Sequence, residues 1–60
     1  MAEEARGASV RTYLELIRFG NADPHAFETA VTVLRMRHPD VSRHDARHLV
    51  ADWICEHIGH

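Results

Sequence analysis

Three stretches of the chain repeat apolar residues at the spacing of one helical face. In each stretch four apolar residues stand at positions i, i+3, i+4 and i+7, on the same side of an α-helix. They are Val10, Tyr13, Leu14 and Ile17 in the first stretch, Phe27, Ala30, Val31 and Leu34 in the second, and Ala46, Leu49, Val50 and Trp53 in the third. No stretch shows the alternation of a half-buried strand. The pattern predicts an all-α three-helix bundle with helices at about 10–19, 24–37 and 43–58.

Residues that favour helix ends flank the first two stretches. Ser9 is a good N-cap residue for the first helix, and Gly20 with Asn21 supplies a stop. Asp23 is the expected N-cap of the second helix, because Pro24 then occupies the first helical position, where its missing N–H costs nothing. These residues predict a short turn between the first two helices.

The third helix has its own boundary residues. Pro39 ends the second helix and biases His38 away from the helical region. Ser42 and Asp45 fit the capping-box pattern at the start of the third helix. Gly59 is expected at the C′ position, just beyond the end of that helix.

The length of 60 residues predicts one domain, and its composition bounds the protein class. Residues 1–8 are small and charged without periodicity, so we expect a flexible arm before a single domain over 9–60. The lone Cys55 excludes a disulfide-stapled secreted fold, and no apolar run is long enough to span a membrane. We therefore expect a cytoplasmic protein. All seven basic residues are arginine, a codon bias that suggests a GC-rich bacterial genome.

A second set of apolar residues lies away from the expected core faces. On helical geometry Leu16 and Phe19 fall to one side of the first core face, and Val33 and Met36 fall to one side of the second. Exposed apolar patches on small proteins tend to mark interaction surfaces. We expect these four residues to form the interface of a homodimer, unless the third helix covers them.

Four arginines cluster around the junction of the second and third helices. Arg35, Arg37, Arg43 and Arg47 are opposed locally by few acids, although the whole chain carries a net charge of −2. Such a local field suits an acidic protein partner. The helix–turn–helix arrangement also allows contacts with nucleic acid. A third interpretation is a solvated face in which the arginines pair with acids of a neighbouring helix.

Six histidines raise the question of metal binding. His44 and His48 stand at i and i+4, and Asp52 lies one further turn along. They are weak candidates because the set does not close, so we expect no metal site. His57 falls on the apolar face of the third helix, where it either packs through its ring or acts as a pH-sensitive interface residue.

No catalytic motif stands out in the chain. Phosphate-binding glycine loops, nucleophile elbows and paired carboxylates are missing from the sequence. We expect a small non-catalytic interaction protein, regulatory or adaptor in kind, that associates with itself or another protein. Neither a cofactor, nor a small-molecule substrate, nor a membrane is expected. The alternative is a helix-turn-helix-like nucleic-acid-binding protein that uses the four clustered arginines.

Overall fold

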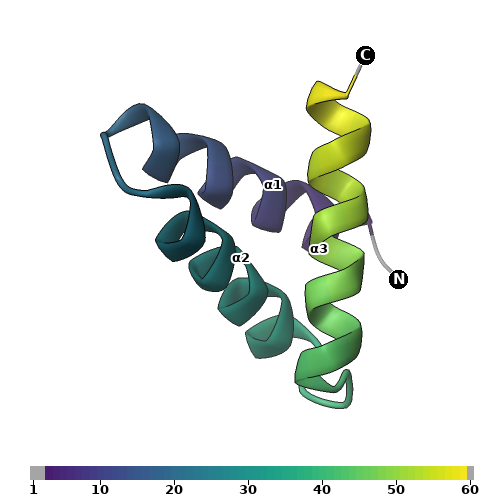
Figure 1. Cartoon of the computed structure of the whole chain (residues 1–60). Helices are drawn as coiled ribbons and strands as arrows, with labels where there is room; N and C mark the ends of the chain where they lie inside the picture. Colours follow the sequence, from purple (N-terminus) through teal and green to yellow (C-terminus); the bar gives the residue numbers. More distant parts are fainter. Residues whose placement is uncertain (1–2, 60) are drawn as a thin grey trace.

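The computed structural model describes residues 3–59 and shows three helices in chain order (Figure 1). They are α1 (Glu3–Arg18), α2 (Asp23–Arg37) and α3 (Arg43–Ile58). Within these residues there is no strand. The predicted all-α three-helix architecture is confirmed, and α2 and α3 lie within one residue of their expected starts and at their expected ends.

Helix α1 begins earlier than the sequence pattern predicts. It starts at Glu3, so the part of the expected flexible arm that the structure describes is helical, while Met1 and Ala2 lie outside the described residues. Two acids in the first turn interact favourably with the helix dipole, and Ala5 is buried in the core. Ser9 is consequently inside α1 and buried, and the expected N-cap at this residue is wrong.

Helix α1 ends in the predicted way, at Gly20 and Asn21. Gly20 has a positive φ of 93°, a conformation that glycine adopts without steric cost. Its N–H donates to the Ile17 carbonyl, and the Asn21 N–H donates to the Leu16 carbonyl, each at 3.0 Å. These two bonds form a Schellman motif. The turn therefore reverses the chain into α2.

The beginning of α2 differs from the prediction by one residue. Ala22 is at the N-cap and makes no side-chain cap bond, so the N-cap assignment of Asp23 is wrong. The Asp23 carboxylate instead accepts a hydrogen bond from the hydroxyl of Tyr13 in α1. The Asp23 carboxylate is therefore bonded to a residue of another helix and not to the backbone at the start of α2.

The ends of α3 follow the sequence more closely. The Ser42 hydroxyl accepts a hydrogen bond of 3.0 Å from the Asp45 backbone N–H, as the capping pattern predicts. Gly59 is the C-cap itself and not the residue after it; its φ is −78° and its N–H donates to the Cys55 carbonyl.

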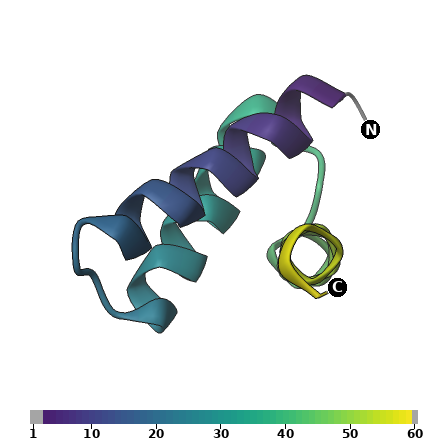
Figure 2. The same cartoon turned by 90° about the horizontal axis from the view of Figure 1, so that it is seen from above.

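Helices α1 and α2 form an antiparallel hairpin, and α3 crosses it. In Figure 2 the hairpin is seen lengthwise while α3 is seen end-on beside it. Alanines of α2 and α3 are completely buried, among them Ala26, Ala30 and Ala46, and such small side chains let helices approach closely. Leu34 and Val50 are the largest apolar side chains that are completely buried. Ile17, expected in the core, is 39% exposed.

Candidate interaction surface

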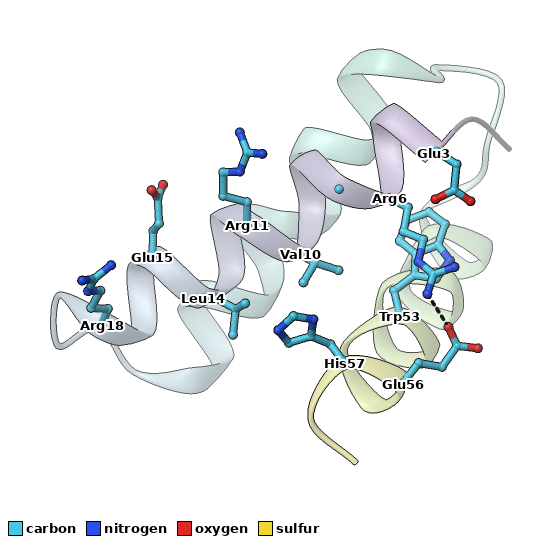
Figure 3. A pocket seen from close by; sticks show the side chains of 11 residues that line it. Glu3, Arg6, Val10, Arg11, Leu14, Glu15, Arg18, Trp53, Glu56 and His57 are labelled. Carbon is cyan, nitrogen blue, oxygen red and sulfur yellow. Dashed lines mark hydrogen bonds and ion pairs between the residues drawn. The ribbon is translucent and has the colours of Figure 1, made fainter. Parts of the chain in front are cut away.

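An open groove separates α1 from the C-terminal half of α3. We call it the α1–α3 groove; its volume is about 760 Å³. Val10 and Leu14 of α1 point toward Trp53 and His57 of α3 across it (Figure 3). The remaining lining residues are glycine or charged: Glu3, Arg6, Gly7, Arg11, Glu15, Arg18 and Glu56. The groove thus has an apolar floor between charged edges.

One ion pair joins the two walls of the α1–α3 groove. An Arg6 Nη2 lies 2.9 Å from the Glu56 Oε1 and donates a hydrogen bond to it (Figure 3). Farther along α1, toward Arg18, the described chain places no side-chain hydrogen bond or ion pair between the walls. The two walls of the groove are therefore joined near Arg6, whereas the end near Arg18 is open.

A second hollow lies on the other side of the same half of α3. Tyr13, Phe27, Ile54, Cys55 and Ile58 are among its lining residues, and most of them are apolar. Trp53 and His57 line the α1–α3 groove, whereas the residues that follow them, Ile54 and Ile58, line this hollow. Ile58 is 60% exposed. The last turns of α3 therefore have open space on both flanks.

The structure does not gather the four predicted interface residues into one surface. Leu16 packs against the core and Val33 is partly buried, whereas Phe19 and Met36 are 78% and 77% exposed. Phe19 directly follows α1 and Met36 lies in the last turn of α2. Because the two helices are antiparallel, these two side chains lie at opposite ends of the hairpin, about 20 Å apart along α2.

The four clustered arginines all have partners within the chain. Arg43 and Arg47 both pair with Glu28 of α2, the first at 3.2 Å. Arg37 lies 3.8 Å from Glu4 of α1. Arg35 donates to the Val41 carbonyl at 3.3 Å. Three of the four arginines therefore pair with acids of other helices, in keeping with the solvated-face interpretation, whereas Arg35 bonds a backbone carbonyl.

The histidines do not assemble with further ligands. The rings of His44 and His48 meet edge to face with centroids 4.6 Å apart. Between residues 3 and 59 there is no group of three or more His, Cys, Asp or Glu side chains placed to hold a metal ion. His57 lines the α1–α3 groove and is exposed, although it continues the apolar face of α3.

Two polar features were not predicted from the sequence. The Tyr13 hydroxyl donates to Asp23, and that hydrogen bond, burial of the ring and the negative charge of Asp23 raise the pKa of Tyr13. The Ser9 hydroxyl is buried without a hydrogen-bond partner among the described residues. Both depend on how α1 meets α2, which no local motif reveals.

Comparison of the chain with protein-family models, with curated proteins and with solved structures finds no match in any of the three. None of the described helices is long and apolar enough to cross a membrane.

Proposed function

We propose that the chain is a small non-catalytic interaction protein, regulatory or adaptor in kind, that binds a second copy of itself. The observation that carries this proposal is the divergence of α3 from the hairpin. It leaves the apolar floor of the α1–α3 groove open, and Ile58, which is 60% exposed, borders the second hollow on the other flank of α3. This surface replaces the set of Leu16, Phe19, Val33 and Met36 as the proposed interface.

Physical chemistry supports a partner at this position. A 60-residue domain buries only about 60% of the surface that its unfolded chain exposes, so it is marginal in stability. Small domains commonly gain stability by assembling. A standard interface takes about 800 Å² from each partner. That is about a fifth of the 4130 Å² surface of this chain, an area that the groove and the last turns of α3 can contribute together.

The alternative of nucleic-acid binding has less support. Contact with phosphates requires arginines that are free to reach them. Arg43 and Arg47 share Glu28, and Arg37 lies beside Glu4. An acidic protein partner would meet the same competition. The exposed thiol of Cys55 is consistent with a reducing compartment such as the cytosol, which we include in the proposal.

The test compares two single substitutions by light scattering across protein concentration. We expect the wild-type mass to approach that of two copies as concentration rises. Ile58→Glu places a charge in the proposed interface and should return the protein to one copy. Met36→Glu is the matched control, because Met36 is also an exposed apolar residue in the last turn of a helix; its mass should equal that of the wild type.

Two results would contradict the proposal. A wild-type mass of one copy at every concentration would exclude self-association. Loss of the dimer in Met36→Glu but not in Ile58→Glu would move the interface to the end of the hairpin. Circular dichroism of both variants serves as the control that they remain helical.

A further inference from the structure

Two of the seven arginines stand apart from the rest. Arg11 and Arg18 make no side-chain hydrogen bond or ion pair within residues 3–59, whereas the other five do. Both line the α1–α3 groove, and they project with Glu15 from the same outer edge of α1 (Figure 3). They are seven residues apart, about 10 Å along the helix. This edge of α1 therefore presents two free positive charges with one negative charge between them.

Helix α3 carries the opposite pattern on one edge. The carboxylates of Asp45 and Asp52 are also without a hydrogen bond or ion pair in the described chain, and they too are seven residues apart. His48 lies between them. Asp52 is one turn before Glu56, which lines the α1–α3 groove, so this edge of α3 faces the α1 side of the molecule. The two edges carry complementary charges at matching spacing.

An antiparallel alignment brings all three positions into register. When Arg11 is opposite Asp52, Glu15 is opposite His48 and Arg18 is opposite Asp45. In an antiparallel pair of helices the numbers of opposite residues have a constant sum, and here each sum is 63. The same alignment sets Leu14 opposite Leu49. A parallel alignment also sets each arginine opposite an aspartate, Arg11 with Asp45 and Arg18 with Asp52. It is less favourable because it sets the charged Glu15 opposite the apolar Leu49. Within one chain the edges cannot meet this way, because α1 and α3 cross and then diverge (Figure 1).

We infer that a second copy lays its α3 antiparallel along the outer edge of α1, with its Asp52 facing Arg11 and its Asp45 facing Arg18. This inference rests on the proposed self-association and specifies its register. A two-fold axis repeats the contact, because an interface of this symmetry uses the same surfaces on both copies. The apolar floor of the groove lies beside the paired edges, so the charges align the copies while apolar burial supplies most of the affinity.

The experiment is a charge swap read out as the dimer dissociation constant by sedimentation equilibrium. Asp52→Arg turns two attractive contacts per dimer into repulsive ones and should raise the dissociation constant about tenfold. Adding Arg11→Asp to Asp52→Arg should restore it to near the wild-type value, whereas adding Arg18→Asp should not. Asp40→Arg makes the same charge change in the turn before α3 and should leave the constant unchanged.

Each failure has a distinct meaning. A wild-type dimer that Asp52→Arg weakens no more than Asp40→Arg overturns the charge pairing and leaves self-association standing. Rescue by Arg18→Asp instead of Arg11→Asp overturns the antiparallel register. A wild-type protein that is monomeric at every concentration overturns the proposed self-association, and this inference with it.

Discussion

At the scale of single residues, the Tyr13 hydroxyl and the Asp23 carboxylate join α1 to α2. The phenol ring is buried in the core, while its hydroxyl reaches the first residue of α2. The bond forms only when Tyr13 is protonated. Its contribution to the free energy of unfolding therefore depends on pH.

We predict that Tyr13→Phe lowers the free energy of unfolding by about 1 kcal/mol at pH 7, the usual net value of one hydrogen bond. The pKa of Tyr13 is raised above 10.0 by the hydrogen bond, burial and the Asp23 charge. The stabilisation is therefore complete below pH 10 and is lost as pH rises through the folded-state pKa. Urea denaturation at pH 7 and at pH 11 measures both effects.

Tyr13 is the only tyrosine, which makes the comparison clean. The difference in stability between wild type and Tyr13→Phe should shrink at pH 11. A difference that stays the same at both pH values would show that loss of the hydroxyl proton does not weaken the fold.

The buried hydroxyl oxygen of Ser9 is a second single atom that we expect to affect stability. Its hydroxyl is buried without a partner in the described chain, at a site inside α1. We predict that Ser9→Ala raises the melting temperature, because it removes an unsatisfied polar group and supplies a better helix former. The gain in free energy of unfolding should be about 1 kcal/mol. A lower melting temperature in thermal denaturation would show that the hydroxyl has a stabilising partner, such as a bound water.

At the scale of the helices, α1 is bounded by residues that act through the backbone. Its N-terminal extension depends on burial of Ala5 against the other helices, whereas its C-terminal end depends on the positive φ of Gly20. The first is a tertiary effect and the second is local. This contrast explains why the sequence predicted one end of α1 and missed the other.

Two glycines of α1 should respond in opposite ways to the same substitution. Gly7 lies inside the helix with no atom within 4 Å of an added Cβ, so Gly7→Ala should raise the free energy of unfolding by about 0.5–1 kcal/mol. Gly20→Ala should lower it by about 1 kcal/mol because alanine is strained at positive φ. Thermal denaturation of both variants measures the difference. Stabilisation by Gly20→Ala would contradict the Schellman ending.

At the scale of the whole molecule, seven of the 16 charged side chains form ion pairs between helices. Glu28 receives two arginines of α3, and Glu4 and Glu56 each receive one from another helix. Because these pairs are exposed, each stabilises the chain little by itself. Arg11, Arg18, Asp45 and Asp52 are the charges on which the proposed assembly depends.

The Ile58→Glu and Asp52→Arg experiments belong to this scale. The first tests whether the open flank of α3 is covered by a second copy. The second tests how that copy is oriented. Because Ile58 and Asp52 lie on different flanks of α3, the two experiments test separate parts of the proposed assembly.

Part of the candidate surface could be predicted from the sequence. Excess apolar surface was expected, and Phe19 and Met36 are indeed exposed. The predicted interface of Leu16, Phe19, Val33 and Met36 is not one surface, because helical geometry gives the direction of a side chain but not the neighbour that covers it. Leu16 turned out to face the core. The α1–α3 groove depends on the crossing of α3, which no residue spacing contains.

The sequence by itself determined the number and order of the helices and all their approximate bounds except the start of α1, because apolar spacing, Gly20, Pro24 and Ser42 act over a few residues. Only the tertiary structure decided which charges are paired and which apolar side chains remain uncovered. These outcomes depend on the angle at which α3 crosses the hairpin. That angle arises from contacts between residues far apart in the chain, among them the completely buried Ala26, Ala30 and Ala46.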